Sequence, residues 1–436
     1  MTPILGAAFL EGFLLAEAEE DKPEDLEDER EGITRRSFLK YAALGGVGIA
    51  AAGIGVYGYT QNWFTGRAPM QWWGIGTTTP EMGFSGETFG GALGDTVVFT
   101  EAPWDPTQLS NRMCADGKDQ FDFITNAGTM HEPLFECGGI VDFDPETALP
   151  GWSRIYSQLR TNNPTISIAE TGQIVGIPII QNGDSVAMDL DEIWGDGTPN
   201  SGGDSPGAGG DSYGLLFDDQ WNGLTAVEKF WACPIYKVAN YLERNNLETI
   251  SDLETLENAD ITKIKNFMLD QKNGGQFKTF WSGWSTAVQL LANKEVVALD
   301  TWEPVVFAVR ALEQNPINAY YMDASEGYYL WNIPVYMTPH GRDANLDRVL
   351  NFGEWTLGGW YGARITTLRG YLTPTPDAVS YARDNPDADG GPYDADFIQG
   401  RHDKVKGKFN DNVSVYGNQA PLNIDKYDAA WSEVTA

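Results

Sequence analysis

The chain has 436 residues, 42% of them hydrophobic, so it is long enough for two or three domains with a packed core. Asp and Glu number 62 against 29 Lys and Arg, which gives a net charge of −33 at pH 7. This acidity argues strongly against a nucleic-acid-binding protein, because such proteins need a basic face. An acidic surface suits a cationic ligand, and it suits equally a protein that must stay soluble in high salt.

The N-terminal part of the chain, residues 1–66, is predicted to be an acidic extension followed by an export signal. Residues 34–40 (TRRSFLK) match a twin-arginine motif, and residues 41–59 follow as an uncharged stretch rich in Gly and Ala. Such a signal sends folded proteins through the twin-arginine translocase. The uncharged stretch is also long enough to span a bilayer. Cleavage and retention as an anchor on the outer face of the cytoplasmic membrane are both open, and retention is favoured.

The next segments predict strands that end in polar or aromatic residues, after an irregular lead-in at residues 67–94. Residues 95–100 (DTVVFT) and 121–125 (FDFIT) are apolar runs rich in β-branched and aromatic side chains, which is typical of buried strands. Residues 126–129 form a turn after the second of these strands. Residues 173–180 (QIVGIPII) predict a further strand, which leaves this part of the chain.

Residues 279–304 (TFWSGWSTAVQLLANKEVVALDTWEP) are predicted to form a helix, a turn and a strand. Apolar residues repeat at helical spacing in the first half, and residues 295–299 are apolar and rich in valine. The strand must end before Pro304, because proline cannot continue a ladder of hydrogen bonds. Trp302 and Glu303 are therefore left at a strand end, where open α/β sheets bind their ligands.

Several segments, taken in this order, resemble extracellular solute-binding proteins of ABC importers, in the spermidine/putrescine-binding branch. The resemblance covers about residues 95–381 and implies an α/β, two-lobed periplasmic-binding-protein-like fold with a hinge and an interlobe ligand cleft. The segments that support it are residues 121–143, 173–180, 217–223 (FDDQWNG), 279–304, 326–331 (EGYYLW) and 368–374 (LRGYLTP).

The resemblance also implies how the chain divides between two lobes, with crossings near Gln181 and Trp302. Lobe 1 is expected to contain residues 95–182 and 303–345. Lobe 2 is expected to contain residues 183–302 and 346–436. A hinge between the lobes would let them close over a bound solute.

By resemblance, the protein is expected to be a monomeric receptor, not an enzyme, that needs no cofactor and delivers a small polar solute to the permease subunits of an ABC transporter. A cationic, polyamine-like solute fits the acidic composition. Carboxylates pair a cation, and aromatic faces add cation–π attraction of about 0.5–2 kcal/mol each. The expected ligand-binding residues are Glu101, Trp104, Thr129, Glu228, Trp302, Glu303, Trp331 and Tyr371.

Three positions depart from the pattern of the polyamine-binding proteins. Ile333 stands where they have an Asp two residues after the Trp that matches Trp331, and Ala127 and Thr129 stand where they have Ser and Tyr. Sugars, which stack on Trp faces, and other small solutes therefore stay open as ligands. A secreted enzyme that uses the twin-arginine pathway and a cell-surface structural protein also stay open, although no catalytic motif supports the enzyme.

The chain has three cysteines, which are too few and too scattered for a metal site. Outside the cell Cys114 and Cys137 could form a disulfide, which would leave Cys233 free. The sequence leaves this pairing open.

Residues 385–396 (NPDADGGPYDAD) resemble a calcium-binding loop, with oxygen ligands expected from Asn385, Asp387, Asp389 and Asp396. The alternative is a solvated acidic loop without a metal ion. Pro386 stiffens the second position of the loop, and a chain this acidic contains such segments by chance. Bound calcium would have a structural role, because the loop follows the ligand-binding motifs.

Overall fold

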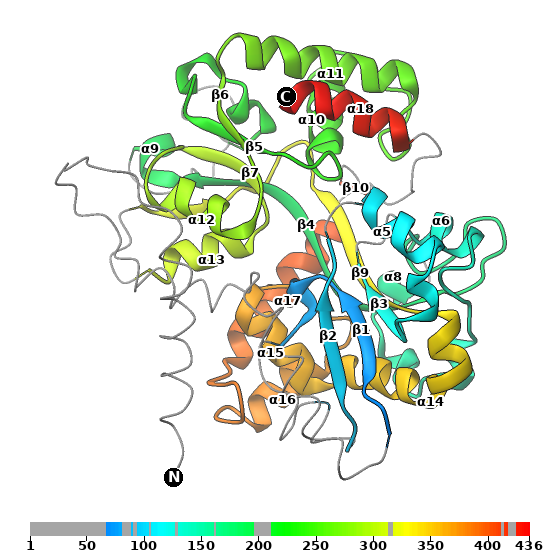
Figure 1. Ribbon diagram of the computed structural model, residues 1–436. Helices are drawn as coiled ribbons and strands as arrows, with labels where there is room; N and C mark the ends of the chain where they lie inside the picture. The colour runs from blue at the N-terminus through cyan, green and yellow to red at the C-terminus, as the bar shows by residue number, and fades with distance from the viewer. Residues whose placement is uncertain are drawn as a thin grey trace, which may run out of the picture. The chain divides into compact units, whose positions relative to one another are not determined.

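The computed structural model contains two groups of parallel strands joined by two long antiparallel strands (Figure 1). It describes residues 67–80, 89, 94–103, 106–126, 130–160, 163–195, 211–312, 317–410, 414–416 and 424–436. The export motif, the uncharged stretch that follows it, and the candidate residues Trp104 and Thr129 lie outside the described residues.

The first group of strands comprises β1 (Met70–Gly74), β2 (Val97–Glu101) and β3 (Phe123–Thr125), with β1 in the middle. Trp72 of β1 is fully buried and packs against Phe99 of β2 and Phe123 of β3. The lead-in predicted to be irregular thus contains the central strand of this group. Its sequence MQWWG does not show a clear alternation, because a parallel strand covered on both faces is mostly apolar; only Gln71 is polar and half-buried.

The second group comprises β5 (Thr225–Glu228), β6 (Phe277–Trp281) and β7 (Ala298–Thr301), which are parallel, with β5 in the middle. A short strand, β8 (Ala319–Tyr321), belongs to the same sheet, where it runs antiparallel to β4.

Two long strands, β4 (Gly176–Asp189) and β9 (Tyr329–Met337), connect the groups, and all their residues are buried. They pair antiparallel with each other; β9 continues onto β3, and β4 continues onto β7 and β8. Gln181, near which the first crossing was expected, lies in β4 opposite Asn332 of β9. The return crossing is β9 rather than the region of Trp302, because the chain after β7 stays beside the second group. The short β10 (Val415–Tyr416) also pairs with β9.

The first lobe is defined here as β1–β3 with the helices beside them, which occupy the lower part of Figure 1. Its core joins β1 and β3 to α5, α6 and α14 through residues such as Trp73, Met113, Leu134 and Phe352. Its helices are α5 (Pro106–Cys114), α6 (His131–Glu136), α7 (Pro145–Ala148), α8 (Ser157–Arg160), α14 (Pro339–Thr356), α15 (Gly359–Arg369), α16 (Asp377–Asp384) and α17 (Ala395–Phe409).

The second lobe is defined as β5–β8 with the helices in the upper part of Figure 1. The C-terminal helix α18 packs along α11, and Tyr427 of α18 contacts Trp231 and Tyr236. Its helices are α9 (Leu190–Trp194), α10 (Pro234–Arg244), α11 (Asn258–Asn273), α12 (Trp284–Ala292), α13 (Pro304–Arg310) and α18 (Ile424–Thr435). Short 3₁₀ helices in the two lobes are Gly76–Thr78, Gly117–Asp119, Trp152–Arg154, Tyr213–Leu216 and Asp219–Trp221.

The helices divide between the lobes differently from the expected boundaries. Helix α13 and strand β8, expected in lobe 1, lie with the second lobe, where they contact α12 and β4. Helices α15–α17, expected in lobe 2, lie with the first lobe, and only α18 joins the second lobe as expected. An apolar helix face fits either sheet, so local sequence does not say which sheet a helix covers.

A disulfide joins Cys114 at the end of α5 to Cys137 just after α6, and Cys233 is a free thiol. This settles the pairing that the sequence left open. The bridge ties two short helices of the first lobe together.

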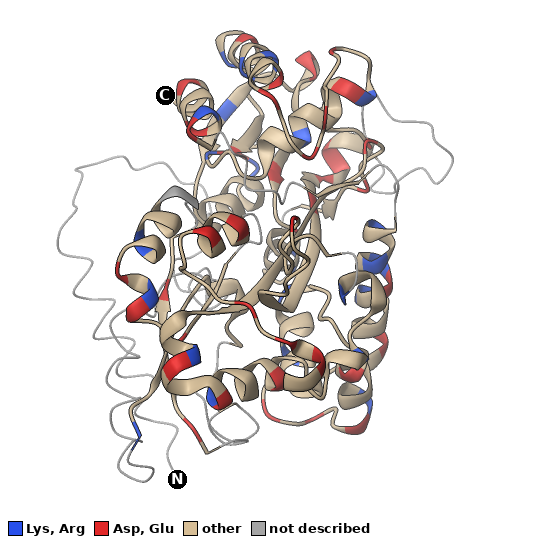
Figure 2. Ribbon diagram, turned by 90° about the vertical axis from the view of Figure 1, so that its right-hand side faces the viewer, with Lys and Arg blue, Asp and Glu red and all other residues tan. Residues whose placement is uncertain are grey.

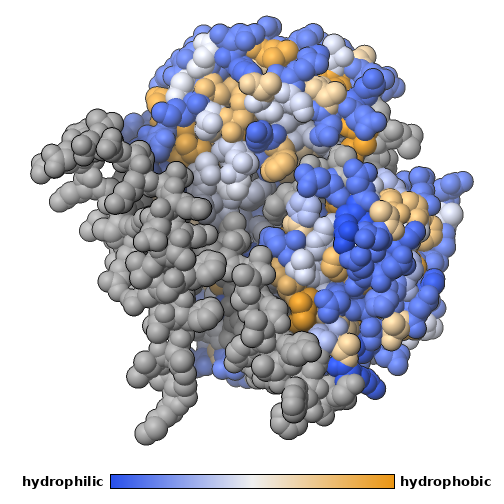
Figure 3. Space-filling model, in the orientation of Figure 1, coloured by the Kyte–Doolittle hydropathy of each residue, from blue (hydrophilic) through white to orange (hydrophobic). Residues whose placement is uncertain are grey.

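Among the residues coloured by hydropathy in Figure 3, most are hydrophilic, and the hydrophobic ones form small separate patches. Acidic residues are spread over both lobes with basic residues between them (Figure 2). Among the described residues, no helix combines the length and the apolar character needed to cross a bilayer. Residues 41–59 are outside that search.

Candidate functional site

The parallel strands of the second lobe end in three of the residues that define the site. Glu228 is the last residue of β5 and lies opposite Trp281, the last residue of β6. Trp302 directly follows β7, and its ring meets that of Trp281 edge-on, with centroids 5.2 Å apart. The carboxyl ends of these strands therefore gather one carboxylate and two indoles, as expected for a ligand site in an open α/β sheet.

A second aromatic pair lies where the crossing strands meet the first lobe. Trp331, the third residue of β9, meets Tyr371, which follows α15, with ring centroids 5.0 Å apart and planes nearly perpendicular. Leu372 is held beside β4 by backbone hydrogen bonds to Gln181 in both directions. The structure thus brings Trp331 and Tyr371 together, although they come from distant parts of the sequence.

A buried polar cluster lies between these two aromatic pairs. Lys237 of α10 forms an ion pair with Asp300 of β7, and the carbonyl of Asp300 accepts the indole N–H of Trp281 at 3.0 Å. The backbone N–H of Glu228 donates to the Asp300 carboxylate at 3.3 Å. All three charged side chains are at most 3% exposed. Burial and the Asp300 charge raise the pKa of Glu228 well above its usual value, against the opposing effect of Lys237.

Asp184 of β4 belongs to the same cluster, and the sequence analysis missed it. It is 1% exposed, and the charges of Lys237 and Asp300 are close enough to shift its pKa. Its signal is present in the sequence as an isolated acid in an otherwise uncharged strand core, IPIIQNGDSVAM. Asn, Gly and Asp are typical turn residues, so Asn182-Gly183-Asp184 favours a turn when it is considered without its pairing to β9.

Glu303, the residue after Trp302, lies in a separate buried ion cluster. Its carboxylate contacts Arg401 at 2.7 Å, Lys408 at 3.1 Å and Lys404 at 3.9 Å, all from α17. Burial alone would raise the pKa of Glu303, but Lys408, Arg401 and Lys404 together outweigh burial and hold that pKa well below its usual range. The charge of this carboxylate is therefore balanced by the chain itself.

Lys408 shows how the protein holds a buried ammonium group. Besides Glu303, its Nζ donates to Asn182 Oδ1 at 3.0 Å and to the Gly183 carbonyl at 2.9 Å. The rings of Tyr321 and Tyr328 face it, with centroids 5.0 and 4.6 Å away. One carboxylate, two amide oxygens and two aromatic faces thus surround a single ammonium.

No protein-family model and no curated protein matches the chain. Solved structures do match it. A putative spermidine/putrescine ABC transporter from Listeria monocytogenes aligns over 84% of this chain and 99% of its own, with 14% identity and a TM-score of 0.60. The Tp0655 (TpPotD) lipoprotein of Treponema pallidum aligns over 84% and 99%, with 11% identity and a TM-score of 0.62. The binding protein MotA from A. tumefaciens B6, in complex with glucopine, aligns over 85% and 100%, with 12% identity and a TM-score of 0.54.

The chain has the two-lobed periplasmic-binding-protein fold. The fold class expected from the resemblance is therefore confirmed. In this fold the crossing strands β4 and β9 are the connections between the lobes, so the Asp184 cluster and the Trp331–Tyr371 pair lie at the junction of the lobes.

In the first lobe of this periplasmic-binding-protein fold, Glu101 lies at the carboxyl end of β2. It is exposed, and its carboxylate accepts the backbone N–H of Gly76 at 3.1 Å. Partial burial of the carboxyl raises the pKa of Glu101, while the Gly76 N–H and Arg369 oppose that rise. Trp104 and Thr129, expected at neighbouring strand ends, are outside the described residues. Glu101 is therefore the one candidate ligand-binding residue at the strand ends of the first lobe that the structure describes.

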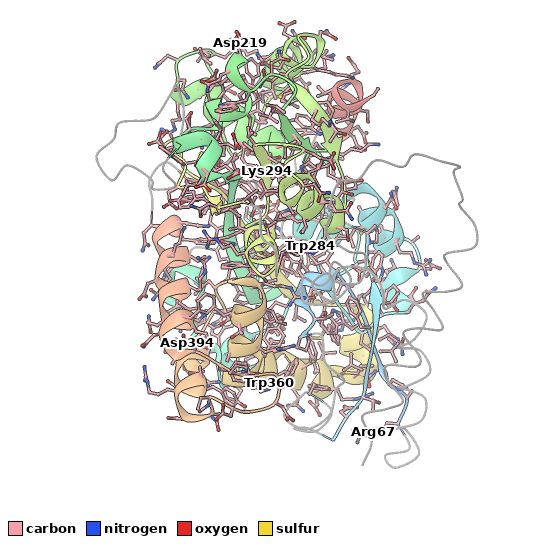
Figure 4. All side chains as sticks on the ribbon, turned by 90° about the vertical axis from the view of Figure 1, so that its left-hand side faces the viewer. Arg67, Asp219, Trp284, Lys294, Trp360 and Asp394 are labelled. Carbon is pink, nitrogen blue, oxygen red and sulfur yellow. A yellow bond between two sulfur atoms is a disulfide. The ribbon has the colours of Figure 1, made fainter. Side chains whose placement is uncertain are left out.

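Backbone carbonyl oxygens of the loop at residues 385–396 accept hydrogen bonds from neighbouring side chains. Trp360 Nε1 donates to the Asp389 carbonyl at 2.9 Å, and Arg364 donates to the Gly390 carbonyl at 2.6 Å. The Asp394 side chain caps α17, and Figure 4 places Asp394 and Trp360 in the same region of the first lobe. Among the described residues, which include this whole loop, no group of three or more His, Cys, Asp or Glu is arranged to hold a metal ion.

Proposed function

We propose that the protein is an extracytoplasmic solute-binding receptor that hands a small cationic solute to an ABC permease. The observation that supports this most is the excess of buried carboxylate at the junction of the lobes. Asp184, Glu228 and Asp300 surround a single cation, Lys237, next to the indoles of Trp281 and Trp331. A cationic solute would balance that charge and would meet aromatic faces that attract cations.

The fold is consistent with this role. The structures that resemble the chain include a protein titled as a spermidine/putrescine transporter and one solved with glucopine. Because these proteins share 11–14% of their residues with this chain, they support a solute receptor without naming its solute. A polyamine is our proposal for the solute class. It rests on the carboxylates of this chain.

The proposed solute site comprises residues from both lobes and from the crossing strands. We assign the solute contacts to Glu101, Asp184, Glu228, Trp302, Trp331 and Tyr371, and we keep Trp104 and Thr129, which lie outside the described residues, as candidates from the sequence. Glu303 is given a structural role instead, because three cations of α17 already surround its carboxylate.

Calorimetric titration of the purified protein tests the proposed function. Spermidine and putrescine represent cationic solutes, and glucose represents the neutral alternative. We expect the two amines to bind with one site per chain and to raise the midpoint of thermal unfolding, because a ligand that binds only the folded state stabilises it. A protein that binds none of the three, nor any solute of a wider thermal-shift screen, would contradict a receptor function.

Export is proposed from residues 34–59 alone. Replacing Arg35 and Arg36 by lysine should keep the protein inside cells that have a twin-arginine translocase, whereas replacing Lys40 by glutamine should not. Fractionation of such cells measures this, and sedimentation with membranes would show whether residues 41–59 stay attached as an anchor. Equal export of the Arg35/Arg36 variant would contradict the proposed route.

A further inference from the structure

Asp184 is the carboxylate of the site whose charge is least satisfied. It lies on β4 opposite Tyr329, in the stretch where β4 and β9 cross between the lobes. Among the described residues, no hydrogen bond reaches either of its carboxylate oxygens. The indole N–H of Trp331 acts on the same carboxyl and lowers its pKa, yet this N–H donates no hydrogen bond to any residue that the structure describes.

The surrounding groups of the chain do not neutralise the ionised Asp184 carboxylate. Lys237 is already paired with Asp300, and Lys408 is held by Glu303. Glu228 adds a further carboxyl with an unsatisfied oxygen, Oε2. An ionised carboxylate buried without partners is costly, so a cationic group bound beside Asp184 would stabilise its ionised form. The titratable and charged groups that act on Asp184, or on which it acts, are Lys237, Asp300, Glu228, Cys233, Lys408, Tyr213, Tyr321, Tyr329 and Tyr371.

The Lys408 site shows which kind of group such surroundings hold. There a carboxylate, amide oxygens and two aromatic faces hold an ammonium. Around Asp184 the carboxylate and the aromatic rings of Trp331 and Tyr329 are present, and no ammonium of the chain is directed at them alone. The described residues also lack the three-ligand grouping that a metal ion needs.

We propose that Asp184 pairs with an ammonium group of the solute and exchanges its carboxyl proton for that ammonium when the solute binds. This inference rests on the proposed function, and it adds a contact that the family pattern did not supply. In the solute-free protein the carboxyl carries the proton, which keeps a buried site neutral. The incoming ammonium arrives already charged, the O–H bond of Asp184 breaks, and the proton leaves to solvent, so the charge of the buried site is again balanced.

The physical setting favours this exchange. Desolvation raises the pKa of Asp184 to about 7, although Lys237, Trp331 and Lys408 oppose the rise. An ammonium in direct contact would lower that pKa, because a close opposite charge stabilises the ionised form. Binding at neutral pH should therefore release protons, in an amount that falls as the pH rises.

Calorimetry with spermidine in two buffers of different ionisation enthalpy, phosphate and Tris, measures that release directly. We expect about half a proton released per spermidine at pH 7, more at pH 6 and almost none at pH 8.5. No buffer dependence at any of these pH values, in a wild-type protein that binds spermidine, would overturn the inference. This calorimetric experiment uses the wild-type protein alone.

Two matched variants locate the effect. Asp184→Asn removes the charge and keeps the shape, and we expect it to weaken spermidine binding by about 30-fold or more and to abolish proton release. The control is Asp189→Asn on the same strand. Asp189 is equally buried, but it caps α9 and pairs with Lys294, which lies in the second lobe (Figure 4), so its variant should bind and release protons as wild type does.

The outcomes separate this inference from the proposed function. If spermidine binds wild type and Asp184→Asn equally, the receptor function stands and the role of Asp184 is overturned. If glucose binds and both amines do not, a neutral-solute receptor remains and the role of Asp184 is again overturned. If no solute binds, the proposed function itself fails.

Discussion

Glu303 and Asp184 are both buried at the junction of the lobes, with exposed fractions of 2% and 1%, yet their surroundings move their pKa values in opposite directions. Three cations of α17 hold the pKa of Glu303 low, whereas desolvation raises the pKa of Asp184 to about 7. The comparison shows that burial does not by itself mark a carboxylate as functional. What distinguishes the two is whether the chain supplies the counter-charge.

Helix geometry explains the difference. Arg401, Lys404 and Lys408 are three and four residues apart on α17, so they lie on one face of the helix and reach Glu303 together. Around Asp184, strand β5 contributes the Glu228 carboxyl and strand β7 the Asp300 carboxylate. Helix α10 contributes Lys237, which is paired with Asp300. We interpret the first cluster as a structural tie between α17 and α13 and the second as the solute site.

The largest expected effect is on the structural tie. Glu303→Gln leaves the ammonium and guanidinium groups of α17 buried without their carboxylate, so we expect the free energy of unfolding to fall by about 3–5 kcal/mol. Chemical denaturation at pH 7 measures it. The control is Glu433→Gln, which breaks the exposed pair with Lys265 and should cost less than about 1 kcal/mol. Equal costs for the two variants would mean that the Glu303 cluster is not a tie.

Replacing Asp184 should change the free energy of unfolding in the opposite direction, towards higher stability. Its pKa in the folded protein, about 7, lies above the 3.8 of an ordinary aspartate, so ionisation costs stability as the pH rises from 3.8 towards 7. Asp184→Asn should therefore stabilise the solute-free protein, by about 4 kcal/mol at pH 8 and by about 2 kcal/mol at pH 5. Denaturation at both pH values tests this, and a variant less stable than wild type at pH 8 would show that the Asp184 charge is satisfied after all.

Removing an aromatic contact of the site should have a smaller effect, and this effect should be on the affinity for the solute. Trp302→Ala removes the indole that meets Trp281, and we expect spermidine binding to weaken by about 1–3 kcal/mol. Trp360→Ala is the control, because Trp360 is similarly buried and lies against the loop at residues 385–396. Calorimetry compares the two. Unchanged affinity in a folded Trp302→Ala protein would remove Trp302 from the site.

The smallest effect is expected at Glu101. This carboxylate is exposed, so water and salt screen its charge, and Glu101→Gln should weaken spermidine binding by less than about 1 kcal/mol. Repeating the calorimetry at low and high salt checks this, since the small loss should shrink further in high salt. A loss as large as that of Asp184→Asn would reverse the ranking of the two carboxylates.

The sequence predicted β2, β3 and β7, because buried strands are apolar runs and residues such as Pro304 end them visibly. It did not predict β5 and β6, whose ends carry Glu228 and Trp281. It did not predict that β9 is the return crossing, or that α15–α17 cover the first lobe. The composition of a strand segment indicates whether the segment is buried. Which strand it pairs with depends on contacts with residues far away in the sequence. Asp184 was missed for a related reason: Asn182-Gly183-Asp184 has the composition of a turn, and only pairing with β9 makes it strand.

The most direct test of the account is the pKa of Asp184 itself, with and without solute. The carboxyl carbons of ¹³C-labelled aspartate can be followed by NMR across pH, and the signal missing from Asp184→Asn identifies the residue. We predict a pKa of about 7 in the solute-free protein and a value well below this after saturation with spermidine. A pKa that stays the same when spermidine is bound would contradict the claim that Asp184 receives the ammonium of the solute.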